Sequence, residues 1–252
     1  MRAIIVMTLR EALRNRLAWL ALAAFAGALL LGWFASAVAL TESAQVRAIA
    51  SGSLMRLTAV LVLCLFVVTS MVREIQDKSL ELLLSFPLPR WRLLLSKLCG
   101  YWVIAGLLAL LATLGAATLA PWPDALIWGA SLACELMLVA TFSVLCLFTF
   151  AQPTAAIASV FSFYLLARSM AAMRLMAHGP LSLDTDAGQS FIVASIDLLA
   201  FLLPELDRFS PAAWLAYHDA SLQDLATVVL QTAVYLTLLA SAALVDLYRK
   251  NF

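Results

Sequence analysis

Long uninterrupted apolar runs are the feature that most limits what this chain can fold into. Six of them are close to the length of about 20 residues that an α-helix needs to cross a hydrocarbon layer of about 30 Å. They fall at residues 17–40, 54–72, 98–119, 126–150, 154–170 and 225–247. Because backbone groups have no water to bond to inside lipid, runs of this length are predicted to be helices. The sequence therefore predicts an all-α integral membrane protein with six transmembrane helices in a single domain.

The composition excludes most soluble functions. Of the 252 residues, 64% are hydrophobic and 12% are charged, whereas soluble domains have about 45–50% apolar and about 25% charged residues. The net charge is +1 and no basic run is long, so we expect no nucleic-acid partner. The cysteines form no CxxC pair and lie in apolar runs, so we expect neither disulfides nor a metal site: Cys64, Cys99, Cys134 and Cys146.

The distribution of lysine and arginine predicts that both termini lie in the cytoplasm. The apolar run at 17–40 is about twice as long as the core of a signal peptide, so it is expected to be retained as the first span. With the N-terminus inside, five basic residues fall in outer segments: Arg47, Arg56, Arg168, Arg174 and Arg208. The remaining eleven of the sixteen fall in inner segments, which the positive-inside rule favours.

Two segments outside the spans are expected to be helical. Residues 1–16 place apolar side chains near one face and Arg10 and Arg14 on another, which predicts an amphipathic helix at the membrane interface; a charged flank that only sets orientation is the alternative. The long outer connection contains the apolar run Phe191–Leu203, which ends at Pro204. This run is too short to span, so re-entrant outer helices are expected over residues 189–213.

The connection between the second and third spans is predicted to contain a short amphipathic helix within residues 73–90. Its polar residues are spaced along one helical face: Glu74, Asp77, Lys78 and Glu81. Leu83 and Leu84 form an apolar ridge beside them, and Pro87 and Pro89 then end the helix. Either the membrane surface or a groove on another protein would have to cover this ridge.

This connection resembles that of ABC-2-type permeases, the membrane subunits of bacterial ATP-binding cassette (ABC) exporters. The matching pattern is an acidic residue, a small-residue pair, then Glu, two leucines, a proline and a basic residue. The chain supplies Glu74, Lys78-Ser79, Glu81, Leu82-Leu83, Pro87 and Arg90, with Lys78 in place of the usual glycine. Residues 202–209 are similar to a segment of permeases associated with maturation of nitrous-oxide reductase and other multicopper enzymes.

The resemblance implies a partner that supplies the energy. In the family, the helix between spans two and three is a coupling helix that docks on a separate ATPase, and two permease chains pair with two ATPase chains. Docking contacts would be the polar residues Glu74, Asp77, Lys78 and Glu81, with Leu83 and Leu84 as the apolar anchor. The chain has no GxxxxGK[ST] motif, so ATP and Mg²⁺ would bind only to the partner. The resemblance also implies a bacterial cytoplasmic membrane, a homodimer and, in the maturation-type branch, a periplasmic partner.

Charged residues inside the predicted spans are the other candidates for function. Glu135 lies in the middle of the fourth span, and a buried carboxylate there is a functional candidate by default. It could line the translocation path, accept a proton, or pair with Arg168 of the fifth span. Arg56 is expected to extend to the interface, and Trp122 and Trp128 are expected to be interfacial anchors.

The favoured interpretation is therefore an exporter permease, with a lipid, a glycolipid, a drug-like molecule or a maturation factor as its substrate. The alternatives are a membrane-embedded enzyme, an ion-coupled carrier and a scaffold subunit. The chain has no HExxH or GxSxG motif, so no catalytic residue is assigned.

Overall fold

The computed structural model describes residues 2–14, 16–39, 41–77, 90–150, 152–177 and 187–249. Every regular element in these ranges is a helix. Their bounds are α1 (Arg2–Arg14), α2 (Leu17–Val38), α3 (Ser43–Gln76), α5 (Arg90–Ala116), α6 (Trp122–Thr149), α7 (Pro153–Ala177), α8 (Ala187–Leu202), the 3₁₀ turn η1 (Leu206–Arg208), α9 (Ala213–Tyr217) and α10 (Leu222–Arg249).

Six of these helices are long and apolar enough to cross a membrane: α2, α3, α5, α6, α7 and α10. They coincide with the six predicted runs, so the prediction of an all-helical chain with six candidate spans is confirmed. The main difference is in α3, which begins at Ser43 rather than at residue 54. Hydropathy missed this part because it contains Gln45, Arg47 and Ser51, yet Ser51 is fully buried against the rest of the bundle.

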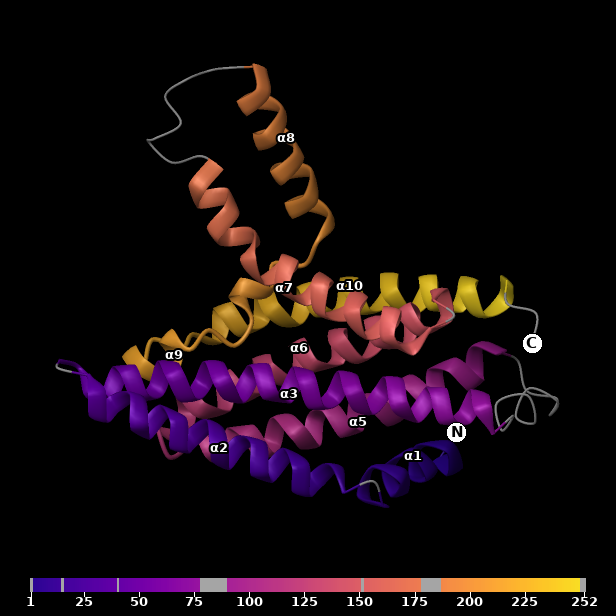
Figure 1. The fold of residues 1–252 in the computed structure, drawn as a ribbon, viewed down its shortest axis with the longest axis horizontal. Coiled ribbons are helices and arrows are strands. Elements are labelled where there is room, and N and C mark those ends of the chain that lie inside the picture. Colours follow the sequence, from indigo (N-terminus) through magenta and orange to yellow (C-terminus); the bar gives the residue numbers. More distant parts are fainter. Residues whose placement is uncertain are drawn as a thin grey trace.

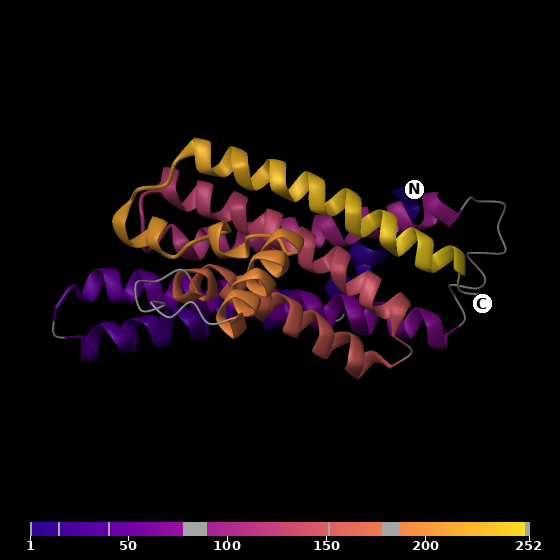
Figure 2. The ribbon, with the colours of Figure 1, turned by 90° about the horizontal axis from the view of Figure 1, so that it is seen from above.

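Helices α2, α3, α5, α6 and α10, together with the N-terminal part of α7, run side by side along the longest axis of the molecule (Figure 1). We call the end that holds both chain termini the termini end, and the end that holds the α2–α3 and α5–α6 turns the far end. The candidate spans α3 and α6 are the most buried, whereas α2 and α10 are among the least buried. Viewed from above, α10 lies along one edge of the bundle and α2 and α3 lie along the other (Figure 2).

The outward surface of the bundle is apolar, as a lipid-facing surface should be. On α2, for example, Leu30 and Phe34 are 70% and 67% exposed. Exposed tryptophans occur near both ends of the long helices: Trp19 and Trp91 toward the termini end, and Trp33 and Trp122 toward the far end. Tryptophans at two levels are typical of the two membrane–water interfaces, and they indicate a multi-pass membrane protein.

Helix α1 packs against α5 and α2. Thr8 and Ala12 are buried, while Met7 and Arg10 are exposed. The packing is close, because a Cβ atom on Gly100 of α5 would lie 3.1 Å from the Cβ atom of Thr8. A helix is therefore present within residues 1–16, as predicted, and its position at the membrane interface stays a prediction.

The connection between α7 and α10 has two parts. The C-terminal part of α7 and the apolar helix α8 form a hairpin that projects from the side of the bundle (Figure 1). The chain then returns, and residues 203–217 pack into the far end, where Leu206, Phe209 and Leu215 are buried. The predicted apolar run Phe191–Leu203 thus largely belongs to α8, and the segment that enters the bundle follows it.

Candidate functional site

A buried polar cluster holds residues 203–217 in the far end of the bundle. Its centre is Ser210, whose exposed fraction is 0%. The backbone N–H of Ser210 donates to Ser131 Oγ at 2.9 Å, and its hydroxyl donates to Glu135 Oε2 at 2.6 Å. Its carbonyl accepts from Arg56 Nη1 at 3.2 Å and from Trp128 Nε1 at 3.1 Å. Helices α3 and α6 therefore supply four side chains that bind every polar group of this one residue.

Arg168 of α7 completes the cluster. Its guanidinium Nη1 donates to the carbonyl of Leu206 and, at 2.7 Å, to that of Phe209. These carbonyls belong to η1 and to the residue after it. The Leu206 carbonyl also accepts from the backbone N–H of Phe209 at 3.2 Å, so the arginine adds a second bond there. The positive charge of Arg168 lies within electrostatic range of Glu135, Arg56 and Asp207. Two cations and two anions therefore meet at this point of the fold.

The structure brings Glu135 and Arg168 into one cluster but does not pair them directly. Each binds residues 203–217 instead, Glu135 through the Ser210 hydroxyl and Arg168 through two carbonyls. Glu135 is fully buried, and its other carboxylate oxygen has no hydrogen-bond partner in the described part of the chain. Within the described part of the chain, Ser210 therefore supplies the hydrogen bond to this carboxylate, and the nearby cation of Arg168 offsets part of the cost of burying its charge.

Two sequence expectations at this end are wrong. Arg56 does not extend to the interface, because its guanidinium donates into the bundle to Ser210. Trp128 is not an interfacial anchor, because it is fully buried and its indole N–H donates to the same carbonyl. Trp122, which is 58% exposed, has the exposure expected of an anchor. Hydropathy cannot show that Arg56 and Trp128 point into the bundle, because both bind the carbonyl of Ser210, which is far away in the sequence.

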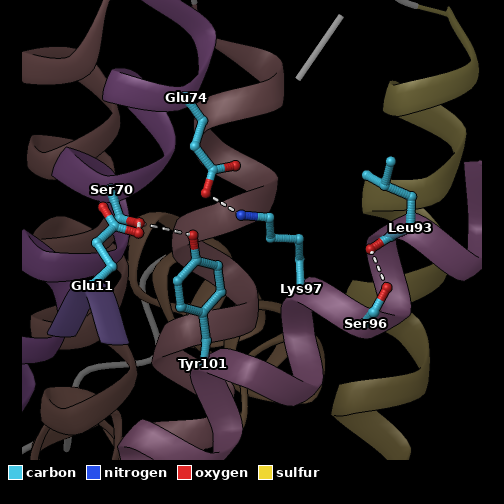
Figure 3. A network of polar contacts seen from close by, with 7 residues as sticks. All are labelled: Glu11, Ser70, Glu74, Leu93, Ser96, Lys97 and Tyr101. Atoms are coloured by element: carbon cyan, nitrogen blue, oxygen red, sulfur yellow. Dashed lines mark hydrogen bonds and ion pairs between the residues drawn. The ribbon is translucent and has the colours of Figure 1, made fainter. Parts of the chain in front are cut away.

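A second polar network lies at the termini end, where α1, α3 and α5 meet (Figure 3). Glu74 near the end of α3 forms an ion pair and hydrogen bond with Lys97 of α5. The exposed fractions of the Lys97 and Glu74 side chains are only 7% and 15%. Ser70, one helical turn before Glu74, donates to Glu11 Oε2 at 2.8 Å and accepts from the Tyr101 hydroxyl at 3.5 Å. The network thus joins three helices through buried polar side chains.

This network determines what Glu74 can do. The sequence predicts that Glu74 is among the residues that dock on a partner, but its carboxylate forms an ion pair within the chain with Lys97. Asp77, directly after α3, is exposed. The other predicted docking residues, Lys78, Glu81, Leu83 and Leu84, lie outside the described residues. Docking itself stays a prediction.

Several functional candidates were not recognisable from the sequence. Taken alone, each of them looks like an ordinary residue of its element: Ser210 of a turn, Lys97 of a helix and Glu11 of an amphipathic helix. Their partners are distant: 75 residues separate Ser210 from Glu135, and 59 separate Ser70 from Glu11. The only local signal is the low frequency of charged residues in apolar helices, which did identify Glu135 and Arg168.

The described residues contain no group of three or more His, Cys, Asp or Glu that could hold a metal ion. In each polar cluster a serine hydroxyl donates to a carboxylate, Ser210 to Glu135 and Ser70 to Glu11, and both serines are buried. What the two clusters can do is hold elements together: one ties a returning segment into the far end, and the other ties three helices at the termini end. In comparisons with known proteins, no family model and no curated protein matches this chain.

Proposed function

We propose that this chain is the membrane-spanning subunit of an exporter driven by a separate ATPase. The observation that carries the proposal is the Glu74–Lys97 ion pair, which joins the two helices that flank residues 78–89. A helical connection that docks on a moving partner can transmit force only if its flanking helices move together. The ion pair supports this, because a buried pair of charges couples α3 to α5 just above the connection.

Residues 78–89 would then be the coupling helix, and Asp77 and Glu81 its docking charges. Glu74 has a different role in this proposal: it holds the base of the connection rather than touching the partner. Helix α1 follows the same movement, because Glu11 is bound to Ser70 in the turn of α3 that precedes Glu74. ATP and Mg²⁺ would bind to the partner, and a second copy of this chain would complete the transporter.

At the other end, we propose that residues 203–217 form the re-entrant segment that closes the outer side of the pathway. Its cluster contacts come from α3, α6 and α7. A relative movement of those helices would change all of these contacts together. In this arrangement Glu135 is a structural group of the closed state and not a residue that binds substrate. The termini end would face the cytoplasm and the far end the outside of a bacterial cytoplasmic membrane.

The proposal is tested by co-expressing the full chain with a P-loop ATPase encoded beside it. We expect the two to co-purify, and we expect the double charge reversal Asp77→Lys and Glu81→Lys to weaken the association by at least about tenfold, since like charges at an interface cost several kcal/mol. The control is the reversal of two exposed acidic residues at the far end, Glu42→Lys and Asp219→Lys. If the Asp77/Glu81 variant binds the ATPase as wild type does, residues 78–89 do not dock and the proposal fails.

A further inference from the structure

An apolar groove runs along the outside of the bundle between α1, α2 and α5. Its volume is about 270 Å³, and every residue that lines it is apolar. Helix α1 contributes Leu9 and Ala12, α2 contributes Leu17 and Ala21, and α5 contributes side chains between Ile104 and Leu114. At about 1.5 Å per residue, that stretch of α5 is about 15 Å long. The groove is thus narrow, elongated and aligned with the long helices.

Such a groove suits a single hydrocarbon chain better than a compact ligand. Pockets for drug-sized ligands carry a few polar groups that fix the orientation of the ligand and are usually larger, about 300–1,000 Å³. Here nothing polar lines the groove, and Leu107, Leu110 and Leu114 along its rim are half exposed or more. In a membrane, the neighbouring medium already consists of acyl chains that run parallel to the helices.

Positive charge is concentrated at one end of the groove. Ala12 and Leu17, which both line it, lie on either side of the α1–α2 turn, and this turn carries the exposed residues Arg14 and Arg16. Exposed Arg10 lies one helical turn before Arg14, on the same face of α1. The first 40 residues contain four arginines and one acidic residue, Glu11. The Glu11 carboxylate accepts a hydrogen bond from Ser70 in the network at the termini end, and its single negative charge leaves the four arginines in excess.

We propose that this groove binds one acyl chain of an anionic phospholipid from the leaflet at the termini end, with Arg14 and Arg16 holding the phosphate. The acyl chain of the lipid lies against α5 and covers the apolar surface that α1, α2 and α5 leave open. The headgroup lies at the α1–α2 turn, where guanidinium groups match a phosphate in charge and geometry. One lipid would thereby bridge α1, α2 and α5, and this inference does not depend on the proposed transport function.

The test is lipid binding to the purified full chain, measured by native mass spectrometry with phosphatidylglycerol and phosphatidylcholine at matched concentrations. We expect phosphatidylglycerol to be retained preferentially. The double variant Arg14→Gln and Arg16→Gln should bind it roughly 5- to 30-fold more weakly, since each basic residue near an anionic headgroup contributes about 1 kcal/mol. The matched control removes two exposed arginines of the same end, Arg73→Gln and Arg249→Gln, and should keep the preference.

A second pair of variants tests the groove separately from the charge. Ala21→Phe fills the groove from its buried wall, and Leu110→Trp fills it from a rim position that is 57% exposed and needs no repacking. Both should lower retention of phosphatidylglycerol while all arginines are present. The proposal is overturned if wild type binds the two lipids equally, or if the Arg14/Arg16 variant binds phosphatidylglycerol as wild type does. It is also overturned if Leu110→Trp leaves binding unchanged, because the lipid would then be held only by charge attraction at the surface.

Discussion

Ser210 combines an unfavourable backbone conformation with an unusually complete set of partners. Its φ angle is 40°, in the left-handed region that non-glycine residues rarely adopt. The conformation directs its N–H, carbonyl and hydroxyl toward three sides of the cluster, where four side chains bind them. The bonds therefore offset the cost of the backbone, and the serine hydroxyl is the component that glycine could not supply.

Substitutions at Ser210 should separate these two effects. Ser210→Ala removes the donor to a buried carboxylate, and we expect a loss of about 1.5–3 kcal/mol in the free energy of unfolding. Ser210→Gly loses the same donor but relieves the positive φ, so it should be less destabilising than alanine by roughly 1 kcal/mol. The measurement is thermal unfolding of the purified chain in detergent.

The control for Ser210 is Ser36→Ala, which removes a hydroxyl that bonds only to the Trp33 carbonyl of its own helix at 2.7 Å. That variant should melt close to wild type. The interpretation of the cluster is wrong if Ser210→Ala does the same, or if the glycine variant melts below the alanine variant.

The Glu74–Lys97 pair should show strong non-additivity. Lys97→Met removes the cation that pairs with the Glu74 carboxylate, and breaking a buried pair in this way costs about 3 kcal/mol or more. Adding Glu74→Gln removes the charge that this pair balanced, so the double variant should recover part of that loss. A double-mutant cycle on unfolding free energies measures the coupling; additive effects would mean that the two charges do not stabilise each other.

The sequence revealed the rare charged residues but not their partners. Glu135 and Arg168 are identifiable because charge is costly in an apolar helix. Whether they contact each other depends on where residues 203–217 enter the bundle, which no local pattern encodes. Glu74 shows the same limit. Its spacing places it on one helical face with Asp77 and Glu81, but the packing of α3 against α5 brings its carboxylate into an ion pair with Lys97.

At the scale of elements, close helix packing rests on small residues. Gly129 of α6 faces Thr113 of α5, and a Cβ atom on Gly129 would lie 2.9 Å from the Thr113 Cβ atom. The threonine cannot easily move, because it is branched, buried, and bonded to the Ala109 carbonyl at 2.7 Å. Nothing lies within 4 Å of the corresponding Cβ position on Gly106 of α5.

This contrast gives a matched pair of substitutions. Gly129→Ala should destabilise the protein by about 1–3 kcal/mol, because the added methyl group forces α5 and α6 apart. Gly106→Ala should be neutral or slightly stabilising, since alanine has the higher helix propensity. Unfolding in detergent compares the two. Equal effects would show that the α5–α6 contact is looser than the structure indicates.

The boundaries of the helices were partly predictable for a physical reason. Hydropathy identifies apolar stretches long enough to cross a membrane, whether lipid or protein surrounds them, so it located all six candidate spans. It does not identify extensions that are buried against protein, and the first part of α3 was missed because its polar residues lower the mean hydropathy. Pro153 at the start of α7 and Pro121 before α6, in contrast, mark boundaries that the chain follows closely.

At the scale of the whole molecule, six crossings place the two termini on the same side. The far end then carries the α2–α3 turn, the α5–α6 turn and residues 203–221, and the termini end carries the α6–α7 turn. This arrangement is independent of any partner, because it follows from the number and direction of the long helices (Figure 1). The distribution of lysine and arginine predicts the direction, with the termini end expected in the cytoplasm.

Single cysteines test this arrangement in a background without the four native ones. Thr41→Cys and Asp219→Cys lie at the far end and Gln152→Cys lies in the α6–α7 turn, and all three positions are exposed. A membrane-impermeant maleimide should label the first two in intact cells and the third only after the membrane is permeabilised. Labelling of Thr41→Cys and Gln152→Cys from the same side would contradict the odd number of crossings between them, which are α3, α5 and α6. If Gln152→Cys alone were labelled in intact cells, the fold would be correct but its orientation in the membrane would be the reverse of the one expected. Residues 78–89 would then lie outside the cell, where no ATPase of the cytoplasm could reach them.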